Sequence, residues 1–284
     1  MKPEDVVTGV GVLLLAWLAY RALRFIAPHD AYVRGDAVGT AKFLDQEPLS
    51  LRLALLTALG RYADATALAR RHPELMGPPA DLNPMALLAR INAAEAFAEL
   101  GDLHVALDLL EFETGDDRFL LAGQRNARAW TLSLAGRDAE ALELVTNTDL
   151  GELGPDYVAE GFLTWALIRM NLDGAGVDAL LEACRARTAR ASTERNLLLL
   201  EARWHALQGR LDDASRCFDQ ARNHRWRRQG ATSLLRLGDA FAKAGAIELA
   251  GAAWRLAPEW DPEAQATSAC LVRLAGLQPI ASQP

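Results

Sequence analysis

One spaced pattern of small residues constrains the fold of this chain more than any other feature. In six places a Gly is followed five positions later by an Ala. Successive Gly positions are 41, 35, 38, 35 and 36 residues apart, and each lies between two apolar segments with helical periodicity. The pairs are Gly60/Ala65, Gly101/Ala106, Gly136/Ala141, Gly174/Ala179, Gly209/Ala214 and Gly245/Ala250. Repetition at this period predicts a stack of similar units.

Each unit is predicted to be a helical hairpin. Gly ends the first helix because it adopts the left-handed backbone conformation without steric cost. Ala at the crossing lets the second helix approach the first closely. The sequence is rich in Ala, Leu and Arg, which are strong helix formers, and poor in β-branched residues. We therefore expect an all-α fold of about six hairpins.

The last unit carries the most detailed pattern. Relative positions 7, 8, 11, 15, 20, 24, 27 and 32 of a 34-residue unit hold Leu237, Gly238, Phe241, Gly245, Ala250, Trp254, Ala257 and Pro262. This pattern resembles the tetratricopeptide repeat (TPR) superfamily, and the layout of the chain is similar to that of bacterial single-pass, membrane-anchored TPR proteins. The resemblance implies a right-handed superhelical stack whose first helices line a concave groove.

The predicted boundaries follow from these units. Residues 41–262 form the repeat array, 263–277 an amphipathic helix that caps it, and 278–284 a frayed tail. The longest interval between glycines contains the segment 76–84, which is too rich in Pro and Gly to be helical. Residues 28–40 are predicted to be a linker.

The segment 1–27 is predicted to be a retained transmembrane anchor. No charged residue occurs from Val6 to Tyr20, and the apolar run reaches Ile26 if Arg21 and Arg24 extend their charges toward phosphates. At ~1.5 Å per residue this length covers about 30 Å, the thickness of a bilayer core. Trp17 and Tyr20 lie where an interfacial aromatic belt falls. A cleaved signal peptide and a buried soluble helix are the competing interpretations.

The distribution of positive charge predicts the orientation of this anchor. Arg21, Arg24 and Arg34 follow the apolar run, whereas Lys2 and the terminal amine precede it. The positive-inside rule then places the repeat array in the cytoplasm, at the inner membrane of a bacterium.

If the register of the repeats is right, positions 2, 5, 9 and 12 of each unit face the groove. These positions hold amide, hydroxyl and aromatic groups, which suit an extended peptide or a helix of a partner protein. The candidate binding residues are Asn126, Trp130, Ser133, Thr164, Ile168, Asn171, Asn196, Arg203 and Asp239. The alternative for each of them is an ordinary solvated helix face. The Lys and Asn that clamp a carboxylate in some TPR domains are replaced by Ser50, Ala54 and Glu95.

Two arginine-rich segments have two interpretations. The first contains Arg185, Arg187, Arg190 and Arg195, and the second contains Arg222, His224, Arg225, Arg227 and Arg228. Either segment suits an acidic partner or lipid phosphates, but solvated turns between repeats, offset by nearby carboxylates, are the favoured interpretation.

The sequence offers no pattern for catalysis. The five His residues are dispersed without metal-ligand spacing, and no phosphate-binding loop or nucleophile elbow occurs. The three cysteines include no C-x-x-C pair, so we expect no disulfide framework and a reducing compartment. A net charge of −7 argues against nucleic-acid binding. We expect no enzymatic activity, no metal and no cofactor.

Two hypotheses of different classes remain. The first is a membrane-anchored TPR scaffold or adaptor that binds other proteins through its groove, with self-association left open. The second is a membrane-tethered, chaperone-like factor for envelope or secreted proteins, with its body on the periplasmic side. The cysteine usage favours the first hypothesis.

Overall fold

The computed structural model describes residues 31, 34, 36–42, 44, 47–79, 82–150, 155–188 and 190–277. Every regular element within these residues is a helix, so the prediction of an all-α fold is confirmed. The predicted anchor with Trp17, Tyr20, Arg21 and Arg24 lies outside the described residues, as do the tail and part of the linker. In the part of the chain that is described, no helix has both the length and the apolar character needed to cross a bilayer.

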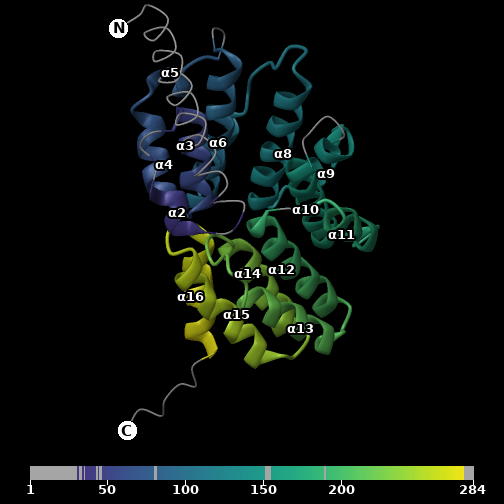
Figure 1. Ribbon diagram of the computed structural model, residues 1–284. Helices are drawn as coiled ribbons and strands as arrows, with labels where there is room; N and C mark the ends of the chain where they lie inside the picture. The colour runs from purple at the N-terminus through teal and green to yellow at the C-terminus, as the bar shows by residue number, and fades with distance from the viewer. Residues whose placement is uncertain are drawn as a thin grey trace, which may run out of the picture.

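Consecutive helices pair as six hairpins (Figure 1). The pairs are α3 (Leu49–Ala58) with α4 (Tyr62–Arg70), α6 (Pro84–Leu100) with α7 (Leu103–Leu109), α8 (Arg118–Leu134) with α9 (Asp138–Thr146), α10 (Pro155–Leu172) with α11 (Val177–Arg185), α12 (Ala191–Leu207) with α13 (Leu211–Arg222), and α14 (Ala231–Lys243) with α15 (Ile247–Trp260). The final helix, α16 (Gln265–Leu277), packs against α15 and α14. Two short helices, α2 (Ala37–Lys42) and α5 (Pro73–Met76), lie outside the pairs.

The turns of the hairpins contain the glycines that the spacing singles out. All six have φ between 70° and 92°, the left-handed region that favours glycine. At Gly101 the amide N–H of Asp102 donates to the carbonyl of Phe97, and that of Gly101 donates to Ala98. These bonds satisfy carbonyls at the end of α6 that have no partner within the helix. The prediction that glycine ends the first helix of each hairpin is confirmed.

The predicted crossing alanines are buried in five of the six hairpins. Five of them are 0% exposed: Ala65, Ala106, Ala141, Ala214 and Ala250. Ala179 is exposed, so the prediction for the fourth hairpin is wrong. Its turn is one residue longer, because Gly176 also has a positive φ of 72° and α11 begins only at Val177. Val177 and Leu181 take the buried face of α11 instead.

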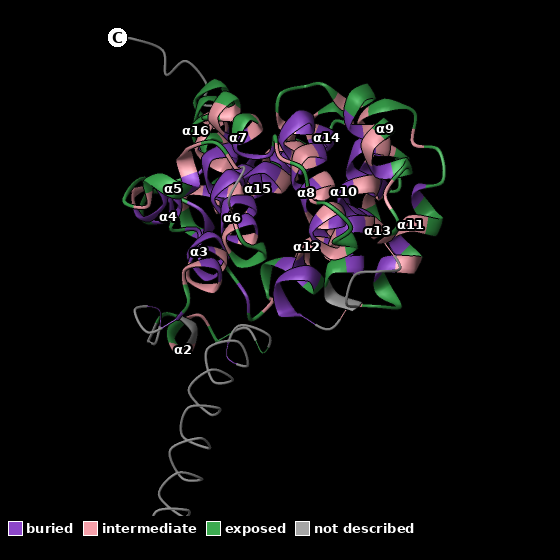
Figure 2. Ribbon diagram, turned by 90° about the horizontal axis from the view of Figure 1, so that it is seen from above, coloured by how far each residue is buried: buried purple, intermediate pink, exposed green. Residues whose placement is uncertain are grey.

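The buried side chains form two large clusters. One unites residues of the first two hairpins with residues of the last two and of α16. The other lies between the middle hairpins, from Ala129 to Trp204. Figure 2 shows that buried residues lie where neighbouring helices meet and that exposed residues cover the outer sides of the helices. Both ends of the array therefore contribute to a single core.

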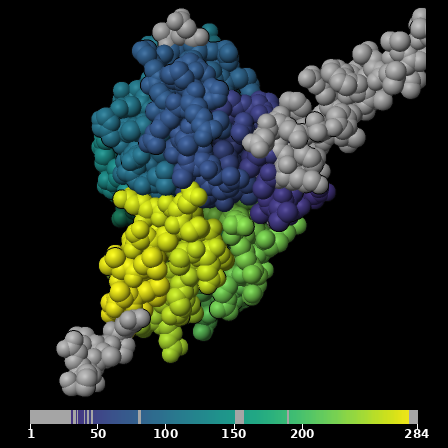
Figure 3. Space-filling view, turned by 90° about the vertical axis from the view of Figure 1, so that its left-hand side faces the viewer, coloured from purple at the N-terminus to yellow at the C-terminus, as the bar shows by residue number. Residues whose placement is uncertain are grey.

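The first hairpin is joined directly to the last. The Tyr62 hydroxyl donates to Asp261 over 3.1 Å, and the Ala63 N–H donates to the Glu263 carboxylate over 2.7 Å. The Gln229 side-chain amide donates to the carbonyl of Thr57 over 2.7 Å. Figure 3 shows the C-terminal helix, in yellow, lying directly against the N-terminal hairpins, in blue. The array closes on itself through these contacts.

Within the last hairpin, Gly238 allows a close contact between α14 and α15. A Cβ atom at this position would lie 2.2 Å from Nε1 of Trp254, whose rigid indole ring is buried. We expect Gly238→Ala to lower the free energy of unfolding by about 2 kcal/mol, because overpacking of up to about 3 kcal/mol outweighs a gain in helix propensity of about 1 kcal/mol. Urea denaturation measures this difference.

Gly123→Ala is the matched control for this substitution. Gly123 lies inside α8, and the nearest atom to an added Cβ is Ile91 Cδ1 at 3.7 Å, an ordinary contact. We expect this variant to be as stable as the wild type or more stable. Equal losses in the two variants would contradict the role assigned to the contact between Gly238 and Trp254.

Candidate functional site

A central cavity is enclosed by the first helices of the hairpins. Its wall is built from α3, α6, α8, α10, α12 and the first turn of α14, together with Gln229 and Gly230 directly before α14. The volume of the cavity is about 280 Å³. Because the first hairpin contacts the last, helices surround this space on several sides, and it stays partly open to solvent.

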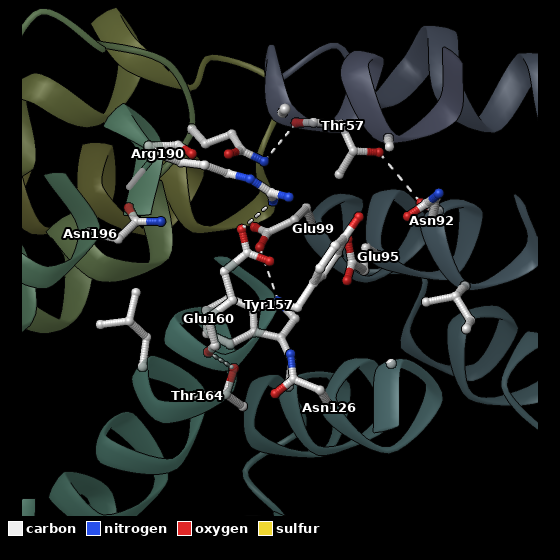
Figure 4. A pocket seen from close by; sticks show the side chains of 18 of the residues that line it. Thr57, Asn92, Glu95, Glu99, Asn126, Tyr157, Glu160, Thr164, Arg190 and Asn196 are labelled. Atoms are coloured by element: carbon white, nitrogen blue, oxygen red, sulfur yellow. Dashed lines mark hydrogen bonds and ion pairs between the residues drawn. The ribbon is translucent and has the colours of Figure 1, made fainter. Parts of the chain in front are cut away.

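Three glutamates from two helices face this cavity. Glu95 and Glu99 are one turn apart on α6, so they lie on one face of that helix. Glu160 comes from α10, across the cavity (Figure 4). Among the described residues, no three His, Cys, Asp or Glu side chains are placed to hold one metal ion together. The carboxylates are therefore spread over the wall of the cavity.

Two of the three carboxylates have strong partners. Glu99 accepts hydrogen bonds from Nε1 of Trp130 at 3.1 Å and from the hydroxyl of Thr232 at 3.4 Å. Glu160 forms an ion pair of 3.1 Å with Arg190, a nearly buried residue directly before α12. The Arg190 guanidinium also lies over the ring of Tyr157, 4.7 Å from its centre.

Glu95 differs from its two neighbours. Its carboxylate accepts no hydrogen bond and forms no ion pair with any residue that the structure describes. Burial, and then repulsion from Glu160, raise the pKa of Glu95 to about 8. The pKa of Glu99 is also raised to about 8, mainly by burial and by the Asp261 charge. Much of this carboxyl pair is therefore protonated at neutral pH.

The raised pKa of Glu95 makes the stability of the protein depend on pH. An unfolded chain loses the Glu95 proton near the ordinary pKa of 4.5, whereas the folded chain keeps it up to about 8. The folded state binds more protons between these values, so its stability falls as pH rises from about 4.5 to about 8. A shift of this size corresponds to about 5 kcal/mol without screening, but the Glu95 side chain is only half-buried and solvent screens its charge. We therefore expect Glu95→Gln to be more stable than the wild type by about 2 kcal/mol at pH 9 and equally stable at pH 4.

Urea denaturation across this pH range tests the expectation. The control is Glu248→Gln, which removes an exposed carboxylate on α15. Curves for Glu95→Gln and the wild type that stay parallel from pH 4 to pH 9 would contradict a raised pKa at Glu95.

The structure distributes the nine predicted groove residues among four environments. Four of them line the cavity: Asn126, Trp130, Thr164 and Asn196. Ile168 is 0% exposed and packs in the core between the middle hairpins, so it does not reach the groove surface. Asp239 forms an ion pair of 3.0 Å with Arg273 of α16.

The remaining three predicted residues belong to a polar network outside the lining of the cavity. Asn171 donates to Asp138 at 2.8 Å and accepts from Arg203 at 2.7 Å. Ser133 donates to Asp138 at 2.6 Å, and its carbonyl accepts from Arg236 at 3.0 Å. Burial lowers the pKa of Arg203 to about 10. These side chains join the first helices of neighbouring hairpins near their C-terminal ends.

Sequence reasoning missed the charged part of the cavity. In the sequence, Glu95 stands out only as a mismatch to the carboxylate clamp of some TPR domains. The patterns there give no indication of Glu99, Tyr157 or Glu160. A signal for the site is nevertheless present in α6, where Glu95 and Glu99 are spaced by one turn in a segment of buried Ala and Phe. Carboxylates are rarely placed on a buried face without a role.

The arginine-rich segments also differ from each other. In the first, Arg195 is wholly buried and donates to the carbonyl of Gln229 at 2.6 Å, so it is not part of a solvated turn. Arg190 lines the cavity and pairs with Glu160. In the second segment, Arg222 pairs with Asp219 at 2.9 Å and the side chains of Arg225 and Arg228 are exposed, as expected for a solvated turn.

The comparisons with known proteins give no guide to the role of this cavity. No protein-family model, no curated protein and no solved structure matches the chain.

Proposed function

We propose that this protein is a membrane-anchored scaffold or adaptor of the TPR type, which binds segments of partner proteins at the concave side of a right-handed superhelical array. The observation that supports this proposal best is that the first helices of all six described hairpins contribute to one cavity. Repeat arrays commonly bind partners on the concave surface that their first helices form. In this proposal residues 1–27 hold the array at the inner face of a bacterial cytoplasmic membrane.

The lining of the cavity suits a side chain or a short segment of a partner. Amides, hydroxyls, aromatic rings and aliphatic side chains all line it, as in peptide-binding grooves. Its volume of about 280 Å³ is near the lower end of the range of roughly 300–1,000 Å³ for ligand pockets. A folded domain does not fit such a space, whereas one inserted part of an extended segment does.

Site-specific photocrosslinking in cells tests the binding of a partner. A photoreactive phenylalanine analogue replaces Leu51, which lines the cavity from α3, or Ile247, which is exposed on α15. We expect a discrete protein adduct from position 51 and none of the same size from position 247. Identical adducts from both positions, or no adduct from position 51, would contradict partner binding in the cavity.

Cysteine labelling tests the proposed topology. The native thiols of Cys184, Cys217 and Cys270 are all buried, and burial raises the pKa of each. A cysteine introduced at the exposed residue Pro78 is therefore the reactive thiol of the array. We expect Pro78→Cys to be protected from an impermeant maleimide in intact cells and labelled after lysis. Labelling in intact cells would overturn the proposed orientation.

A further inference from the structure

The central cavity presents more hydrogen-bond acceptors than its own side chains satisfy. The Glu95 carboxylate has no partner among the described residues, as shown above. Oδ1 of Asn126, on the neighbouring helix α8, is shielded from solvent and receives no hydrogen bond within the described part of the chain. A buried acceptor without a donor costs about 1–3 kcal/mol. This shielded amide oxygen and the half-buried Glu95 carboxylate lie on adjacent helices, and together they suit a ligand that brings N–H or O–H donors.

The charge of the cavity indicates which donors fit. Three carboxylates face it, and Arg190 is directed at one of them, Glu160 (Figure 4). Among the described residues that line the cavity, Arg190 is the only Arg and there is no Lys. A ligand with positive charge removes the repulsion between Glu95 and Glu160, whereas a neutral donor leaves it in place.

The rest of the lining fits an alkyl chain that ends in a positively charged group. Leu88, Ile91 and Leu163 contribute aliphatic surface, and the rings of Trp130 and Tyr157 contribute aromatic surface. Apolar walls with a few placed polar groups bind the stem of a ligand while the polar groups fix its end. Aromatic faces also attract an ammonium group.

We propose that the cavity is a binding site for an alkylammonium group, with Glu95 as its counter-charge and Asn126 as a further acceptor. This group ends a lysine side chain of a partner peptide and also a free aliphatic diamine. The inference rests on the proposed role of the cavity as the site of partner binding, and it names the chemistry that the cavity recognises.

Proton linkage gives the binding a characteristic pH dependence. The cation competes with the proton that Glu95 holds below pH 8, so binding releases a proton and strengthens as pH rises. An alkylammonium stays charged until its own pKa near 10.4. We therefore expect at least tenfold tighter binding at pH 8.5 than at pH 6.

Titration calorimetry of the full chain in mild detergent tests the proposal. The probes are N-acetyl-lysine amide, for the peptide-borne group, and 1,4-diaminobutane, for the free amine. The neutral control is the same lysine amide acetylated at Nζ. We expect saturable one-to-one binding of at least one cationic probe and no binding of the neutral control. The tighter of the two cationic probes identifies the source of the group.

Variants distinguish a cation site from general affinity for amines. We expect Glu95→Gln, which keeps the size of the side chain, to weaken binding at least tenfold at pH 8.5, and the surface variant Glu248→Gln to bind like the wild type. Equal binding by Glu95→Gln and the wild type, equal binding of the neutral control, or no saturable binding would each overturn the proposal. If the photocrosslink at position 51 persists in that case, only the assignment of the cation fails and the scaffold function stands.

Discussion

Asp261→Ala is expected to lower the free energy of unfolding by about 3 kcal/mol and to release the first hairpin from the last. The Asp261 side chain is 0% exposed and accepts from the Tyr62 hydroxyl and from the Ala231 N–H, both at 3.1 Å. Alanine leaves both buried donors without a partner, at about 1–3 kcal/mol each. The relief of a buried charge, whose pKa is raised by burial, offsets part of this loss.

Two measurements test this expectation. Urea denaturation gives the loss of stability, and amide hydrogen exchange reports protection in α3 and α4, which should fall before that of α8 and α10. Asp239→Ala is the control, because Asp239 pairs with Arg273 at the surface and such pairs contribute about 0–1 kcal/mol. If Asp261→Ala loses less than the control, or if α3 keeps its protection, other contacts hold the two ends together.

Arg90→Ala is expected to have a still larger effect, a loss of about 4 kcal/mol. The Arg90 side chain, 4% exposed, donates to the carbonyls of Leu109 at 2.6 Å, Leu75 at 2.8 Å and Gly77 at 2.5 Å. A further bond of 3.3 Å reaches the carbonyl of Asp108. One guanidinium thereby satisfies carbonyls at the end of α7 and at the end of α5. Its removal leaves them without this donor, and the bonds to Leu109 and Leu75 are buried.

The same denaturation experiment tests this role, with Arg128→Ala as the control. Arg128 forms a 3.7 Å ion pair with Glu111 at the surface, so its removal should change stability by less than about 1 kcal/mol. Arg90→Lys should recover little, because one ammonium cannot span carbonyls from two helix ends. Full stability of Arg90→Lys would show that charge alone, and not the planar array of donors, is what the site requires.

The local structure of this protein could be predicted from its sequence because local signals determine it. Gly101 ends α6 independently of how the distant parts of the chain pack, because the left-handed turn depends on only a few neighbouring residues. The error at Ala179 is also local: Gly176 adds a second left-handed residue, and one extra residue in a turn moves a different face of the helix inward. The spacing of the glycines alone does not distinguish the turn at Gly101 from the longer turn at Gly174.

The cavity could not be predicted in the same way, because it depends on how the ends of the array meet. Tyr62 and Asp261 are 199 residues apart, and no sequence pattern near either residue predicts that the two are in contact. The periodicity identifies positions on the first helices, and Asn126, Trp130, Thr164 and Asn196 do line the cavity. The periodicity does not show how far along each helix the cavity extends. It therefore also predicts Ile168 and Arg203 as groove residues, although both side chains are buried away from the cavity.

The contact between the two ends also fixes the number of hairpins. An open array tolerates the gain or loss of a unit, because each unit touches only its neighbours. Here a deleted or duplicated hairpin would separate Tyr62 from Asp261 and divide the core that the outer hairpins share. Descendants of this chain can therefore vary in the side chains that face the cavity much more freely than in the number of hairpins. A new binding specificity must evolve by substitutions within an array of constant length.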